Sequence, residues 1–69
     1  MPGVLEKRSF SLSGHRTSVA LEADFWSALE KIAAGEGIAL SALVTRLDAG
    51  RAEGQPLASA LRVFALKSK

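Results

Sequence analysis

The stretch HRTSVALEADFWSALEKIAAGEGIALSALV, residues 15–44, decides the fold that this chain of 69 residues is expected to adopt. Over residues 15–21, apolar or branched side chains alternate with Arg16, Ser18 and Ala20. A period of two predicts a strand that turns one side to a core and the other side to solvent. The remainder has the apolar period of two helices separated by a glycine break, so we expect a strand followed by two helices.

Apolar residues at helical spacing give the approximate bounds of three helices. The first is expected over about residues 23–35, and Gly37 suits its end because glycine adopts a positive φ without cost. The second is expected over about residues 40–50. Pro56 opens the third, over about residues 57–65, where the Ala-rich composition favours a helix over the strand that RVFAL also allows.

The two ends of the chain carry weaker patterns. We expect residues 1–6 to be disordered and residues 67–69 to form a tail, which leaves a domain over residues 7–66. Residues 7–12 alternate weakly, and Gly14 either kinks one long strand or forms a turn between two short ones. The predicted fold class is mainly α, with one N-terminal strand and a third, C-terminal helix.

A lone strand in so small a chain lacks a partner, and unpaired backbone N–H and C=O groups are costly to bury. We therefore expect this strand to be capped, frayed or paired with another molecule. A core of this size supplies only roughly 3–5 kcal/mol, and the chain has no cysteine for a disulfide. Pairing with a second copy would give a two-stranded ribbon flanked by four helices, the right width for a DNA major groove. The side chains expected in the shared core of this obligate dimer are Val19, Leu21, Phe25, Trp26, Leu29, Leu43, Val44 and Leu47.

The composition argues against several classes of protein. Without cysteine there is no thiolate metal site, and the single histidine, His15, has no cluster of carboxylates around it, so we expect no metal and no cofactor. The serines lack a histidine base oriented by a carboxylate, so we do not expect an enzyme. No apolar run approaches the roughly 20 residues that span a bilayer, and the N-terminus lacks the apolar region of a signal peptide. We therefore expect a cytoplasmic protein.

The segments GHRTSVALEADFWSALEKIA, residues 14–33, and LASALRVFAL, residues 57–66, carry a family resemblance. The order of strand, helix, glycine-containing break and helix over about residues 15–48 resembles the ribbon-helix-helix family of the Arc and MetJ repressors. From about Lys7 to Leu66 the chain is similar to short bacterial ribbon-helix-helix proteins that are regarded as DNA-binding.

This resemblance implies an intertwined homodimer, with a homotetramer as the alternative, that binds double-stranded DNA through an antiparallel ribbon made of one strand from each chain. It implies that Arg16, Ser18 and Ala20 read base edges and that a phosphate binds at the start of the second helix, around Ser41. Ala39 stands there in place of the usual Ser or Thr cap, and Ala20 offers only a methyl group to a thymine.

Each feature also has an alternative interpretation. Arg16 either contacts guanine or remains a solvated charge, and Lys7 and Arg8 either contact flanking phosphates or only solubilise an N-terminal arm. Phe25 and Trp26 fit core packing better than a base-stacking platform, because they lie in a helical apolar stripe. The predicted function is a sequence-specific DNA-binding protein and transcription regulator. The alternative is a homo-oligomeric interaction module that does not bind DNA.

Overall fold

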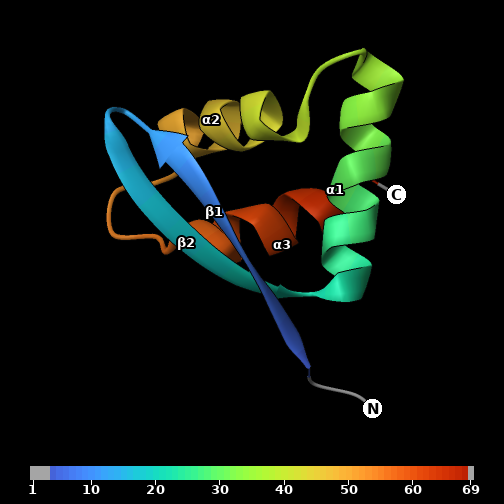
Figure 1. The fold of residues 1–69 in the computed structure, drawn as a ribbon, viewed down its shortest axis with the longest axis horizontal. Helices are drawn as coiled ribbons and strands as arrows, with labels where there is room; N and C mark the ends of the chain where they lie inside the picture. Colours follow the sequence, from blue (N-terminus) through green and yellow to red (C-terminus); the bar gives the residue numbers. More distant parts are fainter. Residues whose placement is uncertain (1–3, 69) are drawn as a thin grey trace.

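The computed structural model describes residues 4–68 and consists of a β-hairpin followed by three helices (Figure 1). The strands are β1, Leu5–Leu12, and β2, His15–Glu22. The helices are α1, Ala23–Glu36, α2, Leu40–Gly50, and α3, Leu57–Lys67. Each helix begins where the apolar spacing placed it. The third helix runs to Lys67, so that residue is not part of a tail.

The strand that precedes α1 has a partner within its own chain. β1 pairs with β2 along their whole length in an antiparallel register, from Leu5 opposite Glu22 to Leu12 opposite His15. The expectation of one N-terminal strand without a partner in its own chain is therefore wrong. The weak alternation over residues 7–12 belongs to a true strand, which satisfies the backbone groups of one edge of β2.

The tight turn between the strands has two residues with positive φ, Ser13 at 51° and Gly14 at 81°. Two consecutive positive φ angles define the type I′ turn, whose twist matches that of an antiparallel hairpin. Of the two roles left open for Gly14, the structure has the turn. Leu5 and Glu6 already belong to β1, so the expectation of disorder is wrong for these two residues, and residues 1–3 lie outside the described part of the chain.

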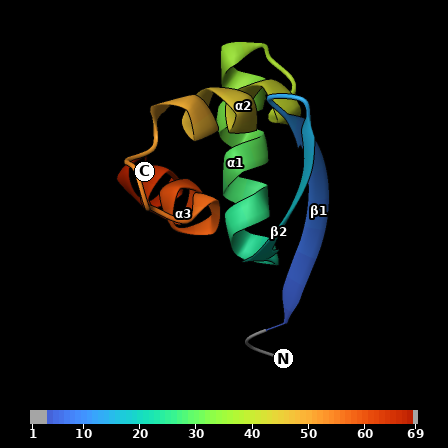
Figure 2. The same cartoon turned by 90° about the vertical axis from the view of Figure 1, so that its left-hand side faces the viewer.

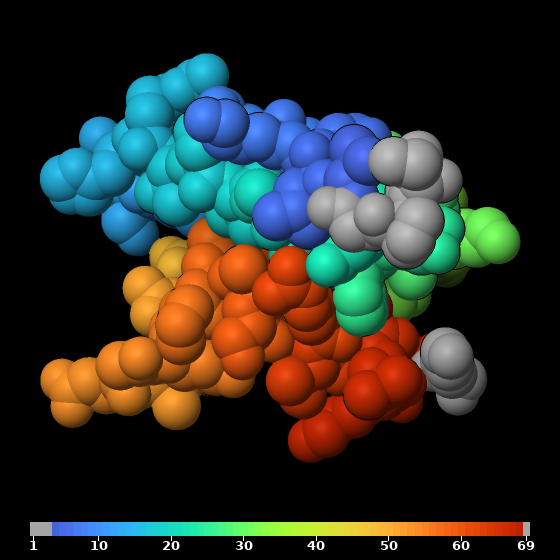
Figure 3. All heavy atoms as spheres, turned by 90° about the horizontal axis from the view of Figure 1, so that it is seen from below, coloured from blue at the N-terminus to red at the C-terminus, as the bar shows by residue number. Residues whose placement is uncertain are grey.

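The hairpin forms an outer layer that covers the helices on one side (Figure 2). Its inward side places Phe10, Leu12, Val19 and Leu21 against the helices, and all four are buried. Seen from below, β1 and β2 run along one side of the molecule, and residues 51–56 with α3 occupy the other (Figure 3). A sheet with one buried face has its opposite face free for solvent or a ligand.

The core is closed within one chain. Of the residues assigned to a shared dimer core, six are almost completely buried and two, Phe25 and Leu47, are partly buried against them. The six are Val19, Leu21, Trp26, Leu29, Leu43 and Val44. The argument that one chain cannot hide these side chains is wrong, because β1 and α3 cover them with Phe10, Leu12 and Leu61.

Candidate nucleic-acid interface

The outward face of the hairpin brings together side chains from both strands. Residues that stand opposite each other in an antiparallel pair project to the same side, with Cβ atoms about 4.5–5.5 Å apart. The register therefore gives four pairs on this side, which are Leu5 with Glu22 at the end away from the turn, Lys7 with Ala20, Ser9 with Ser18, and Ser11 with Arg16. All but Ala20 and Glu22, which are partly buried, are exposed. The three base readers implied by the resemblance, Arg16, Ser18 and Ala20, thus share one face with Lys7.

The charge on this face is positive and available to a ligand. Within residues 4–68, four of the five arginines form ion pairs with carboxylates, and Arg16 is the fifth. Arg16 lies near the turn and Lys7 lies near the opposite end, so two cations flank the central serines. An exposed guanidinium without an internal partner keeps its five donors free for an acceptor outside the chain.

The acidic residue on this side of the hairpin pairs with an arginine of α3. Glu22, at the end of β2, accepts a hydrogen bond from Nε of Arg62 in α3 at 3.2 Å. A hydrogen bond from its own backbone amide, and then the Arg62 guanidinium, lower the pKa of Glu22. This carboxylate stays charged near neutral pH, but its partner offsets its repulsion of an anionic ligand.

The two central serines contact each other across the strands. The Oγ atoms of Ser9 and Ser18 lie 3.0 Å apart and share a hydrogen bond in which either can donate. A hydroxyl carries one donor and two acceptor lone pairs, so the pair retains hydrogen-bonding capacity toward solvent or a base edge. Ser18, which the resemblance implies as a base reader, is therefore one half of a cross-strand pair.

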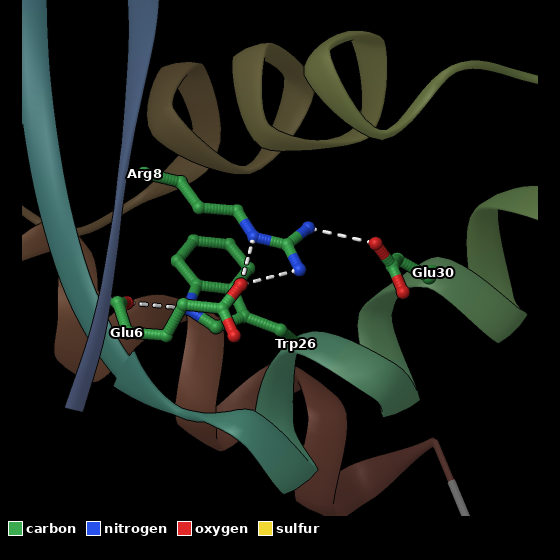
Figure 4. A network of polar contacts seen from close by, with 4 residues as sticks. All are labelled: Glu6, Arg8, Trp26 and Glu30. Atoms are coloured by element: carbon green, nitrogen blue, oxygen red, sulfur yellow. Dashed lines mark hydrogen bonds and ion pairs between the residues drawn. The ribbon is translucent and has the colours of Figure 1, made fainter. Parts of the chain in front are cut away.

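Arg8, the other basic residue assigned to the interface, lies on the opposite face. Its guanidinium bonds Glu6 at 2.6 Å and Glu30 of α1 at 2.7 Å, and its Cζ atom lies 4.9 Å from the ring centroid of Trp26 (Figure 4). These hydrogen bonds, the one to Glu30 above all, raise the pKa of Arg8. With both carboxylates bound and an aromatic ring beneath it, Arg8 anchors β1 to α1 and is not placed to contact phosphates.

Trp26 completes this anchor from the core side. It is buried, its Nε1 atom donates a hydrogen bond to the backbone oxygen of Glu6 at 2.7 Å, and its ring packs against Phe10 at a centroid distance of 5.8 Å. The interpretation of Trp26 as a packing residue rather than a base-stacking platform is confirmed. Phe25 is partly buried beside the core, under the guanidinium of Arg62.

Ser41 belongs to the helical layer and not to the outward face of the hairpin. It is exposed in the first turn of α2, where Ala39 is the N-cap and provides no side-chain hydrogen bond. The first amides of a helix without a side-chain cap remain able to bind an anion. Ser41 is thus on a different surface element from Arg16 and Lys7.

Sequence reasoning did not place Ser9 and Ser11 on the same face as Arg16 and Ser18. Their signal was the parity of residues 7–12, in which Lys7, Ser9 and Ser11 alternate with the inward residues. The alternation alone does not show which of the two sets of residues faces the core, because that depends on the partner strand, which the sequence does not reveal.

Other kinds of site find little support in the described residues. From residue 4 to residue 68, no three His, Cys, Asp or Glu side chains gather as a metal ion would require. None of the described helices has both the length and the apolarity to cross a membrane.

The chain was also compared with known protein families, curated proteins and solved structures. No curated protein and no solved structure matches the chain significantly. The family model described as a ribbon-helix-helix domain matches residues 5–68, which include the hairpin and all three helices. The chain belongs to the ribbon-helix-helix domain family.

Proposed function

We propose that this chain is a sequence-specific DNA-binding protein that regulates transcription in the bacterial cytoplasm. The outward face of its β-ribbon enters the major groove, which admits a two-stranded ribbon. Arg16 donates two hydrogen bonds to guanine O6 and N7, Ser18 contacts a base edge, and Ala20 meets a thymine methyl group. The first turn of α2, around Ser41, faces a phosphate and fixes the register of the protein on the duplex.

The observation that carries this proposal is that Arg16 is exposed and forms no ion pair with a carboxylate of the described chain. It is the arginine of the described chain that no carboxylate neutralises, and it stands on the exposed face of a ribbon of groove width. Lys7 adds a second cation to the same face. Membership in a family whose domains are typically DNA-binding regulators supports the same assignment.

We further propose that the protein acts as a homodimer of folded chains. A two-fold axis between the chains would match two half-sites of a palindromic operator. Leu66, with 62% of its surface exposed, and the partly buried Phe25 line an apolar groove of about 160 Å³ between α1 and α3, which is available for contact between chains.

The test is selection of duplexes from a random library, followed by titration of a selected duplex with wild type and Arg16→Ala. We expect Arg16→Ala to cost about 1–3 kcal/mol for each half-site contact on the selected sequence. The cost should be smaller on random DNA, where only a charge is lost. Lys31→Ala is the matched control, because Lys31 is an exposed cation on α1.

Salt dependence supplies a second measurement on the same complex. A dimer that contacts about 4–6 phosphates predicts a slope of log affinity against log salt of roughly −4 to −5. Equal binding by wild type and Arg16→Ala would contradict the role of Arg16. Absence of binding by wild type at low salt would favour the alternative, an interaction module that does not bind DNA.

A further inference from the structure

We propose that the groove between α2 and α3 is a docking site for an acidic amphipathic helix of a partner protein. The groove has a volume of about 350 Å³, and no residue of β1 or β2 lines it. Figure 2 shows α3 on the side of the molecule away from the hairpin. A partner in this groove would therefore leave the outward face of the hairpin open, and the proposal does not depend on DNA binding.

The floor of the groove is apolar and partly open to solvent. Four of its residues are spaced at i, i+3, i+4 and i+7 and so form one face of α3, namely Ala60, Val63, Phe64 and Lys67. Val63 has 41% of its surface exposed, and Phe64 and Leu47 of α2 are only partly buried. Covering these side chains with a second apolar surface removes them from water and so favours binding.

The rim of the groove is basic. Arg46, Arg51 and Lys67 line it, and none of its lining residues is acidic. Lys67 forms no ion pair with a carboxylate of residues 4–68. The two arginines pair with Glu36 and Asp48, which do not line the groove, and each guanidinium retains unused N–H donors. Charge complementarity therefore favours an acidic partner over a neutral or basic one.

The two helices that form the groove favour a helix as its occupant. A helix uses its backbone N–H and C=O groups internally, so neither α2 nor α3 offers the free edge that an extended segment would need. A helical partner satisfies its own backbone and contributes only side chains. The face of α3 from Ala60 to Lys67 extends about 10 Å, at about 1.5 Å per residue, which matches two turns of a second helix.

The lining of the groove also defines the pattern of the partner's side chains. Apolar residues at i, i+3, i+4 and i+7 would cover Val63 and Phe64. Glu or Asp residues beside this apolar stripe would lie near Arg46 and Lys67 at the rim. The partner is thus recognised by acidic charge and helical apolar spacing together.

The experiment titrates the isotopically labelled full-length protein with two synthetic helical peptides and records amide chemical shifts. Both peptides carry leucine at i, i+3, i+4 and i+7, and the residues beside the leucines are glutamates in one peptide and lysines in the other. We expect the glutamate peptide to shift the amides that line the groove and the lysine peptide to shift none of them. Lys67→Glu and Val63→Ser should each weaken binding of the glutamate peptide about fivefold or more. Lys31→Glu is the matched control, because it reverses an exposed cation on α1 outside the groove, and thermal unfolding of every variant verifies folding.

Several results would overturn the proposal. Absence of shifts with the glutamate peptide at low salt is one, and unchanged affinity of the folded Lys67→Glu variant is another. Equal binding of both peptides would show that apolar contact alone explains the binding. If a short duplex displaces the peptide and itself shifts the groove amides, the basic rim is a DNA surface. A lower oligomeric state of Val63→Ser in sedimentation would show that the groove is a contact between copies of the chain.

Discussion

Trp26 shows how one residue serves both the core and the surface. Its ring is buried and carries the Arg8 guanidinium on one side, while its Nε1–H satisfies the backbone oxygen of Glu6. Sequence periodicity predicted the burial but not the hydrogen bond, because the acceptor, Glu6, lies twenty positions away in a segment that was expected to be disordered. The position of β1 on the helices therefore depends on a core tryptophan.

Trp26→Phe should destabilise the protein by about 1–2 kcal/mol more than the loss of ring area accounts for. Phenylalanine preserves a ring for Arg8 and Phe10 but leaves the partly buried oxygen of Glu6 without its donor. Urea unfolding followed by circular dichroism measures the change. Glu30→Gln serves as a comparison, since it removes an exposed ion pair worth at most about 1 kcal/mol. A smaller loss in Trp26→Phe than in Glu30→Gln would contradict this role.

At the scale of elements, the hairpin depends on its turn. The type I′ turn requires positive φ at both central residues, and serine at position 13 is the less suitable of the two. Ser13→Asn should therefore stabilise the protein by up to about 1 kcal/mol, because asparagine enters the left-handed region more readily. Gly14→Ala should act in the opposite direction through strain alone, because no atom lies within 4 Å of an added Cβ.

Thermal unfolding and amide hydrogen exchange in β1 and β2 test both changes. Destabilisation of similar size in Ser13→Asn and Gly14→Ala would indicate that the chain does not form this turn. Gly37→Ala is a useful control, because it strains a positive φ of 72° at the end of α1 and leaves the hairpin unchanged.

At the scale of the whole molecule, the core is complete without a second chain. The fully buried side chains include Leu21, Leu29 and Leu61, which come from β2, α1 and α3. In the described part of the chain, no buried side-chain N or O atom lacks a hydrogen-bond partner. We therefore expect dimerisation to add a contact between chains that already fold on their own.

Over about a hundredfold range of protein concentration, the midpoint of thermal unfolding should consequently fall on dilution only until the dimer has dissociated and then level off at the value of the folded single chain, because association raises the midpoint only where the dimer is populated. Calorimetry or circular dichroism at the two extremes measures this. Loss of folded structure at the dilution at which the dimer dissociates, measured by sedimentation beside circular dichroism, would show that folding requires the partner. Leu66→Lys is the matched variant, because it should weaken an α1–α3 dimer contact without altering the buried core.

The sequence determined the parts of this protein that follow from local periodicity. The spacing of Phe25, Leu29 and Ile32, with equivalent spacing further along, predicted the starts of all three helices, and the alternation of β2 separated inward from outward residues. These features need only a count along the chain, because a helix or strand repeats its faces at a fixed interval. The same local motifs carried the family resemblance that the domain match confirms.

The tertiary structure decided which segments are partners. Whether Gly14 bends one strand or turns between two depends on the energy of pairing residues 5–12 with residues 15–22, and no local pattern contains that energy. Once the hairpin forms, Arg8 turns inward to Glu30 while Ser9 meets Ser18 on the outward face. The dimeric core inferred from the sequence became a core within one chain for the same reason, because burial depends on contacts between elements that only the fold brings together.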